Sequence, residues 1–259
     1  AKKMKANGED VIGFGAGEPD FNTPERIKQA GIRAIENNET RYTPVGGSDA
    51  LKVAIISKLQ RDNGLTYEKN QILASCGAKH SFYNLAQVLW QAGDEVIIPA
   101  PYWVSFPEMV TLAGARPIII HAGAEQDFKI TPEKINNAVT PNTKAIMINS
   151  PSNPTGSAYD KSELEKLAEC ALRHNLLIIS DEIYEQIVFD GFRHTSIASI
   201  SNEVQKQCVV INGISKSYAM TGWRIGYIAA GDPEIVKQVT KLQGQSTSNP
   251  CSISQAASI

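Results

Sequence analysis

The hydrophobic and polar positions of this chain form short apolar runs separated by longer amphipathic stretches. The apolar runs predict buried β-strands at residues 72–75, 94–100, 116–122, 143–150, 176–181, 208–213 and 224–230. The amphipathic stretches predict α-helices at residues 24–38, 48–62, 79–91, 105–113, 132–139, 161–174 and 233–243. This alternation is typical of an α/β fold, in which a mostly parallel sheet carries helices on both faces.

Composition and charge exclude several classes of function. Of the 259 residues 42% are hydrophobic, which is enough to bury a sizeable core. The net charge of −2 gives no electrostatic reason to expect nucleic acid or an anionic membrane as a partner. No apolar run is long enough to span a bilayer, and no secretory signal is visible. We therefore expect neither nucleic acid nor a membrane as a partner.

The cysteines and histidines narrow the expected location and chemistry. The four cysteines lie far apart and form no C-x-x-C pair, which predicts reduced thiols in a cytoplasmic protein. The four histidines are scattered without the spacing of metal ligands, so no metal site is expected.

Polar and aromatic residues follow the apolar runs. In a parallel sheet, ligands bind outside the carboxyl ends of the strands. The segments found there are 75–79, 101–103, 149–156, 181–184 and 215–216. Lys216 is the most informative of these residues, because an amine held at such an edge suits Schiff-base formation. An isolated Ser-Lys-Ser sequence would be read as a solvated loop, but its companions favour the chemical role.

Taken together, these segments resemble the class I and II aminotransferases, which are pyridoxal 5′-phosphate enzymes of fold type I. The resemblance is greatest to the bacterial aspartate aminotransferase subgroup, and it extends from AGEPDFNTP at 16–24 to QSTSNP at 245–250. It implies that residues 24–246 form the cofactor-binding large domain, after an N-terminal segment at 1–23.

The resemblance implies roles for five residues around the cofactor ring. Lys216 would form the Schiff base with the cofactor and later move a proton at the substrate α-carbon. Asp181 would pair with the pyridine nitrogen and keep it protonated. Tyr184 and Asn153 would bind the ring hydroxyl, and Trp103 would stack on the ring. Without the resemblance, Asp181 would be read as a helix cap and Trp103 as a core residue.

A second group of residues matches the phosphate site of the family. Gly77 and Ala78 open a helix, where backbone N–H groups favour an anion. Ser215 and Arg224 match the serine and arginine that bind the phosphate. Tyr42 matches a tyrosine that reaches the phosphate of the neighbouring subunit, which implies a homodimer. Ala78 stands where the family pattern has glycine or serine, but that contact uses the backbone.

The resemblance also implies the substrate contacts. Gly17 would approach the substrate through its backbone, and Lys79 would bind the side-chain carboxylate of a dicarboxylic substrate. Trp103 and Asn153 would line the same space. The arginine that binds the substrate α-carboxylate is expected beyond residue 259, in a small C-terminal domain absent from this chain.

The ends of the sequence fit that expectation. The chain begins with Ala1, and its last residues stop without a helix C-cap, so we expect a piece cut from a longer protein. Residues 247–259 would begin the connection to the missing domain. As written, the chain is expected to be an incomplete enzyme.

The resulting hypothesis is an aminotransferase that acts on L-aspartate and 2-oxoglutarate. Transamination of alanine, aromatic amino acids or prephenate, and C–S lyase activity, remain open because they use the same core. A cofactor-binding domain of a transcription regulator is a further alternative, although no DNA-binding segment is visible. An NAD-binding protein is disfavoured: Gly13, Gly15 and Gly17 alternate, but no helix follows at once, and Glu18 and Asp20 would repel a pyrophosphate.

Overall fold

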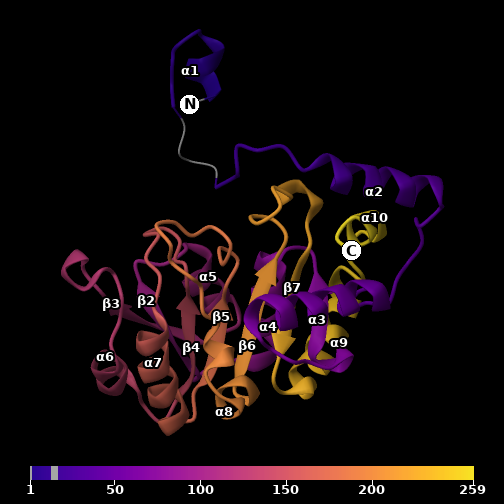
Figure 1. The fold of residues 1–259 in the computed structure, drawn as a ribbon. Coiled ribbons are helices and arrows are strands. Elements are labelled where there is room, and N and C mark those ends of the chain that lie inside the picture. Colours follow the sequence, from indigo (N-terminus) through magenta and orange to yellow (C-terminus); the bar gives the residue numbers. More distant parts are fainter. Residues whose placement is uncertain (1, 13–16) are drawn as a thin grey trace.

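The computed structural model describes residues 2–12 and 17–259, and these residues contain one seven-stranded sheet (Figure 1). The strand order is β1-β7-β6-β5-β4-β2-β3, and every predicted strand is present. The bounds are β1 Ile72–Ser75, β2 Glu95–Ala100, β3 Arg116–His121, β4 Thr143–Asn149, β5 Leu177–Asp181, β6 Cys208–Gly213 and β7 Gly226–Ala230. Strand β7 runs antiparallel to β1 and β6, whereas the other neighbouring pairs are parallel. The predicted mostly parallel α/β fold is confirmed.

The predicted helices are also present. The long ones are α2 Glu25–Glu36, α3 Asp49–Asn63, α4 Ala78–Leu89, α5 Ser105–Leu112, α6 Pro132–Ala138, α7 Lys161–Arg173 and α9 Pro233–Ser246. The short ones are α1 Lys2–Ala6, α8 Asn202–Lys206 and α10 Ser252–Ala256, with 3₁₀ turns η1 Lys69–Gln71, η2 Ala124–Gln126, η3 Ile197–Ser199 and η4 Thr221–Trp223. Helices α1 and α8 were not predicted, because five residues are too few to establish a helical period.

Local hydrogen bonds explain where several helices begin and end. The Ser48 hydroxyl accepts a hydrogen bond from the Leu51 N–H at the start of α3. The Asp160 and Glu163 side chains form a reciprocal capping box at the start of α7. Helix α3 ends at Gly64, whose φ of 67° is a left-handed conformation that glycine adopts easily.

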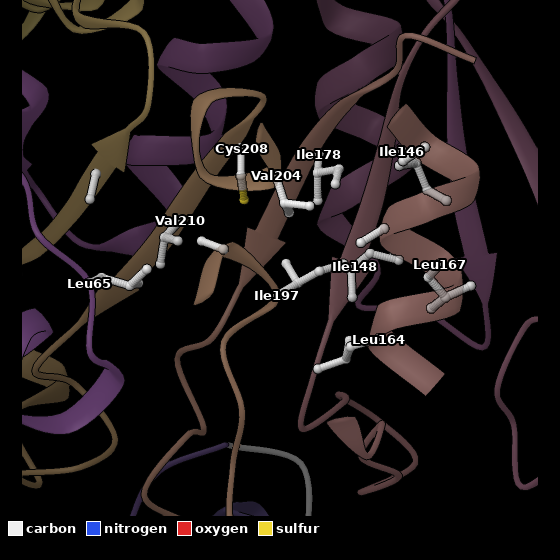
Figure 2. Packing of buried hydrophobic residues seen from close by; sticks show 14 of the residues in the cluster. Leu65, Ile146, Ile148, Leu164, Leu167, Ile178, Ile197, Val204, Cys208 and Val210 are labelled. Atoms are coloured by element: carbon white, nitrogen blue, oxygen red, sulfur yellow. The ribbon is translucent and has the colours of Figure 1, made fainter. Parts of the chain in front are cut away.

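Two hydrophobic clusters cover the two faces of the sheet. Because side chains alternate along a strand, Ile178 of β5 points to one face and Ile179 to the other. The first face packs against α3, α6, α7 and α8, and the second against α4, α5 and α9. Figure 2 shows part of the first cluster, where Ile146 and Ile148 lie beside Leu164 and Leu167 of α7. This two-sided burial holds the strand ends in fixed positions.

The strand ends meet at one edge of the sheet. Asp181 at the end of β5 is in register with Asn149 of β4 and Ile211 of β6. Since β7 is antiparallel, it begins at the edge where these strands end. It starts at Gly226 rather than at 224 as predicted, because Arg224 has a φ of 57°, which is incompatible with an extended strand. Within residues 2–12 and 17–259, no helix has the length and apolar character needed to cross a membrane.

Candidate active site

A cavity of about 580 Å³ lies at this edge of the sheet. Its lining residues are Gly17, Glu18, Ala78, Lys79, Trp103, Asn149, Asn153, Asp181, Ile183, Tyr184, Ser215, Lys216, Thr221 and Arg224. Ten of them were singled out from the sequence, and they come from segments up to 207 residues apart (224 − 17). The structure therefore brings most of the predicted site residues into one space.

Asp181 forms the buried floor of this cavity. Its side chain is 6% exposed, and one carboxylate oxygen accepts a hydrogen bond of 3.1 Å from the Ile183 N–H. Burial raises the pKa of Asp181 to about 7, and the nearby charge of Glu182 adds to the increase. A carboxylate in such a place is stabilised by a cationic partner, because opposite charges attract strongly where water is excluded.

Tyr184 and Asn153 form one wall beside Asp181. Burial is the main cause of the raised pKa of the Tyr184 phenol, to which the charge of Asp181 adds, while the Asn153 side chain acts in the opposite direction. The Asn149 side chain accepts a hydrogen bond of 2.8 Å from the Asn153 N–H and donates one of 3.1 Å to the Asp181 carbonyl. Asn149 thus ties the wall to the floor, a role that its position in the sequence did not reveal.

Lys216 lies across the cavity from this wall, in the loop after β6. Its Nζ atom donates a hydrogen bond to the Gly17 carbonyl and lies 5.7 Å from the centre of the Tyr184 ring. Partial burial lowers the pKa of Lys216, and the charge of Arg224 lowers it further, whereas Glu18 raises it. A lysine with a lowered pKa has a larger neutral fraction, which is the form that attacks carbonyl carbon.

Arg224 and the start of α4 form a candidate anion site. The guanidinium donates hydrogen bonds to the Thr221 carbonyl at 2.8 Å and to the Cys76 carbonyl at 3.2 Å. It lies directly over Gly77, whose φ is 90° and where a Cβ atom would overlap it. Ser215 is 8% exposed and lines the same cavity. An arginine and the N–H groups of a twelve-residue helix suit a phosphate.

Gly226 supports this anion site from below, and sequence reasoning missed it. A Cβ atom on Gly226 would overlap the Gly77–Ala78 peptide and would come within 2.8 Å of the Ala78 Cα atom. The first residue of β7 therefore has to be glycine for α4 to begin where it does. The only sequence signal was a glycine inside a strand pattern, which often marks a close approach of backbone.

Trp103 and Lys79 form the upper part of the cavity. The Lys79 Nζ atom lies 4.8 Å from the centre of the Trp103 ring, a distance typical of a cation–π contact. The Trp103 ring in turn packs edge-to-face on Phe106, with ring centres 5.2 Å apart. Trp103 is thus both a core contact and a cavity wall, and it places the exposed Lys79 at the mouth.

Two predicted site residues do not line the cavity. Gly77 lies next to it, under Arg224. Tyr42 is 91% exposed and lies outside the lining of this chain's own cavity. Gly13 and Gly15, which were weighed as part of a dinucleotide motif, lie outside the described residues.

A buried polar cluster lies next to Asp181, and sequence reasoning missed it. The Glu182 carboxylate is 1% exposed and accepts hydrogen bonds from the hydroxyls of Ser180 at 2.8 Å and Ser196 at 2.7 Å. His194 pairs with the same carboxylate at 3.2 Å. Burial lowers the pKa of His194, but the hydrogen bond and the charge of Glu182 outweigh that effect, and the pKa is raised.

Glu185 extends this cluster to helix α3. Its carboxylate pairs with Lys58 and accepts a hydrogen bond of 3.0 Å from the Asn63 side chain. The ligand atoms of the two glutamates and the histidine lie within 4.8 Å of one another, a spacing that could hold a metal ion. Their oxygens already accept hydrogen bonds from protein groups. The cluster is accounted for by its position, since it anchors both ends of the turn that carries Tyr184.

Comparison with known proteins gives a consistent picture. Residues 9–259 match the family model described as aminotransferase class I and II. The chain is 58% identical over 259 residues to aspartate aminotransferase of Bacillus sp. (strain YM-2), covering 100% of this chain and 66% of that protein. It is 51% identical over 260 residues to aspartate/prephenate aminotransferase of Cereibacter sphaeroides, covering 100% of this chain and 65% of that protein.

A solved structure agrees with these sequence matches. The crystal structure of the aspartate aminotransferase from Rhizobium meliloti superposes with a TM-score of 0.95 at 45% identity. The match covers 99% of this chain and 64% of that one. The chain therefore spans about two thirds of the length of the relatives that it matches.

Proposed function

This chain belongs to the class I and II aminotransferase family, as its sequence motifs predicted, and we propose that its gene product transfers an amino group between L-aspartate and 2-oxoglutarate, with pyridoxal 5′-phosphate as cofactor. One observation carries the proposal: Lys216, Asp181 and Arg224 line one cavity of about 580 Å³. The relative at 58% identity, which is named aspartate aminotransferase, supports the choice of substrate.

The side chains present fit this cofactor. Pyridoxal phosphate, when bound, supplies an aldehyde that condenses with amines and a protonated ring that accepts electrons from the substrate α-carbon. Asp181 would hold the positive charge on the ring nitrogen. The raised pKa of Asp181 supports this role. A buried carboxyl group without a cation nearby favours its neutral form, so its charged form requires a cationic partner such as the ring nitrogen. Tyr184 and Asn153 would hydrogen-bond the ring hydroxyl, and Trp103 would cover the ring.

The other side of the cavity would bind phosphate and move protons. Arg224, Ser215 and the N–H groups at the start of α4 would bind the phosphate. The Lys216 amine would bind the aldehyde covalently and, when released by the incoming amino acid, would move a proton at the substrate α-carbon. Lys79 would face the side-chain carboxylate of aspartate at the cavity mouth.

The cofactor assignment is tested by chemical labelling of the gene product. Reduction with borohydride in the presence of pyridoxal phosphate, followed by peptide mass mapping, is expected to find the pyridoxyl group on Lys216. A pyridoxyl group on Lys79, or no label on the folded protein, would overturn the assignment.

The substrate assignment has a specific competitor. The relative at 51% identity is named aspartate/prephenate aminotransferase, so prephenate is a second candidate amino acceptor. Rates with aspartate, alanine, phenylalanine and prephenate, measured under the same conditions, separate these candidates. Aspartate and 2-oxoglutarate are expected to give the highest catalytic efficiency.

We place the group that binds the substrate α-carboxylate outside these 259 residues. Arg224 is the one arginine among the described residues that line the cavity, and the phosphate requires it. An arginine–carboxylate pair is the usual means of fixing an α-carbon over a cofactor. Comparable catalytic efficiency from the 259-residue chain and the gene product would contradict this placement.

We also propose a cytoplasmic homodimer in which Tyr42 binds the phosphate in the partner's cavity. An aromatic side chain that is 91% exposed on its own chain is available for such a contact. The free state of the four cysteines agrees with a reducing compartment. At a cofactor concentration that leaves Tyr42→Phe dimers largely unoccupied, mixing Tyr42→Phe and Lys216→Ala subunits should restore activity, because one site of the hybrid dimer carries neither change. A gene product that sediments as a monomer would refute the sharing.

A further inference from the structure

The loop that carries Tyr42 is held from inside the protein by two buried glutamines. We define the Tyr42 loop as residues 42–48, between α2 and α3. Its first residue is 91% exposed, whereas Gly46 and Gly47 are buried. The Gly46 carbonyl accepts a hydrogen bond of 2.9 Å from the Ala74 N–H of β1. The loop is thus anchored at its middle and exposed where Tyr42 projects.

Gln255 of α10 is hydrogen-bonded to residues near both ends of the Tyr42 loop. It is 1% exposed, and its side-chain oxygen accepts a hydrogen bond of 2.8 Å from the Ser48 N–H. Its side-chain nitrogen donates to the Thr43 hydroxyl at 3.0 Å and to the Pro250 carbonyl at 2.8 Å. One buried amide therefore fixes the separation of residues 43 and 48, because each of its polar groups has a loop partner.

Gln243 of α9 holds the middle of the loop. It has no exposed surface, and its side-chain nitrogen donates to the carbonyls of Val45 at 2.8 Å and Ala74 at 2.9 Å. Its oxygen accepts a hydrogen bond of 3.2 Å from the Asn84 side chain on α4. The loop is thereby connected to the helix whose first residues form the anion site. Figure 1 shows α9 and α10 toward the β7 side of the sheet, and α10 contacts α2, the helix that precedes the loop.

The amide groups of Gln243 and Gln255 both form hydrogen bonds with the Tyr42 loop, and such bonds depend on direction as well as distance. A leucine of similar volume in either place would leave backbone groups of the loop without a partner and out of reach of water. An ordinary core position would not need an amide whose donors and acceptor are all engaged. The arrangement therefore specifies the path of the loop in addition to filling space.

We propose that Gln255 and Gln243 are positioning residues for the neighbouring subunit: they fix the loop that presents Tyr42 to the phosphate in the partner's cavity. This inference rests on the proposed homodimer and the proposed role of Tyr42. The proposal predicts that a substitution at Gln255 weakens cofactor binding in the other subunit and not in its own.

Hybrid dimers of the gene product test this prediction. In each hybrid, one subunit carries Lys216→Ala, so that borohydride labels only the site of the other subunit. Gln255→Leu is placed either in the Lys216→Ala subunit or in the subunit that keeps Lys216. The readout is the concentration of pyridoxal phosphate that gives half-maximal labelling, which reports cofactor affinity independently of turnover.

Gln255→Leu in the Lys216→Ala subunit is expected to raise this concentration at least about threefold, and in the other subunit to leave it unchanged. Tyr42→Phe in the Lys216→Ala subunit serves as the reference for complete loss of the contact. It is expected to raise the same concentration about tenfold or more, because a hydrogen bond to a charged group is lost. Gln29→Leu is the matched control, because Gln29 lies exposed on α2 and its side chain hydrogen-bonds Glu25, one turn away on the same helix. Gln243→Leu should behave like Gln255→Leu. If Gln255→Leu does not fold, Gln255→Glu takes its place.

The outcomes separate the two proposals. If Tyr42→Phe has no effect from the Lys216→Ala subunit, the shared phosphate site is wrong, and the role of Gln255 falls with it. If Tyr42→Phe acts as expected but Gln255→Leu has no effect, the positioning role alone is overturned. An equal effect from either subunit also overturns it, because that result indicates a general loss of structure.

Discussion

Asp181 and Tyr42 lie at opposite extremes of exposure, and they represent two different sides of the candidate site. Asp181 is 6% exposed, and Ser215 nearby is 8% exposed. The turn that carries Tyr184 is anchored by two buried carboxylates. On the other side, Lys79 and Arg224 are exposed, and Tyr42 is 91% exposed.

The difference separates two tasks. The buried side is fixed by the core of this chain, and it sets the electrostatics of the site through burial. The open side carries the side chains for which we propose partners that this chain does not supply, namely a phosphate, a substrate carboxylate and a second subunit. Substitutions on the buried side should change both stability and activity, whereas those on the open side should change activity alone.

The largest effect is expected for Lys216→Ala, on the open side. Losing the covalent link and the proton carrier should lower kcat by about 10⁴-fold or more. The free energy of unfolding of the cofactor-free protein should stay within about 0.5 kcal/mol, because the amine is half-exposed and its burial is unfavourable to its charge. Steady-state kinetics and urea unfolding measure the two quantities. A large loss of stability would break the distinction between the two sides.

Asp181→Asn should affect both quantities. Transamination should fall by about 10³-fold, because the charge that stabilises the protonated ring is lost. The effect on stability depends on pH. Asp181 has a folded pKa of about 7, above its ordinary value of 3.8. The contribution of the Asp181 carboxyl group to the free energy of unfolding is therefore fully present below about pH 4 and is lost as pH rises through 7.

The cofactor-free protein should accordingly become less stable relative to Asp181→Asn by up to about 4 kcal/mol between pH 4 and pH 8. Urea unfolding at intervals across this range measures the difference. Added pyridoxal phosphate should abolish the trend, since a cationic ring nitrogen stabilises the carboxylate. A pH-independent difference without cofactor would mean that burial does not control this group.

Gly226→Ala tests how far the phosphate side depends on the sheet. The added methyl group would overlap the Gly77–Ala78 peptide, so the start of α4 has to move. A loss of about 1–3 kcal/mol in stability is expected from overpacking, with weaker cofactor binding. Gly222→Ala is the matched control, because no atom of the described residues lies within 4 Å of a Cβ atom placed on Gly222. Equal cofactor affinity in the two variants would contradict the role given to Gly226.

The smallest effect is expected for His194→Gln, which removes a charge from the cluster beside Tyr184. The pKa of His194 is raised, so its stabilising effect is fully present below about pH 6.5 and is lost as pH rises through the higher folded pKa. The variant should be less stable by about 1 kcal/mol at pH 6, and the difference should shrink at alkaline pH. Urea unfolding and an NMR titration of the imidazole check both statements.

The sequence was sufficient for the fold because its strands are continuous apolar runs between well-capped helices. Strand β5 illustrates this: its apolar residues are followed by the buried Ser180 and then by Asp181, which lines the cavity at the sheet edge. The start of β7 was misplaced by two residues, since nothing in the pattern indicated that Arg224 adopts a left-handed conformation. Periodicity describes burial and does not describe single backbone angles.

The rest of the site depends on contacts between distant segments. Gln255 and Gln243 bond the Tyr42 loop across 207 and 198 positions, separations that no sequence window spans. The partners of Glu182 are at most 14 positions away, but two of them lie in an irregular segment that carries no periodic signal. Asn149 and Gly226 were likewise ordinary members of strands until their neighbours were known. The resemblance to a family pointed to the residues that we propose to touch the cofactor, but it could not identify those that hold them in place.

The hydrogen bond between Lys216 and the Gly17 carbonyl has a consequence for synthesis of the protein. The two residues are 199 positions apart, and Arg224 reaches back 148 positions to the Cys76 carbonyl. Contacts of such long sequence separation form late, because closing the loop costs entropy before it brings any gain. On the ribosome, which adds about 5–20 residues per second, the anion site cannot close until β7 has emerged. The first tight binding of phosphate would therefore signal that a nascent chain has completed its sheet.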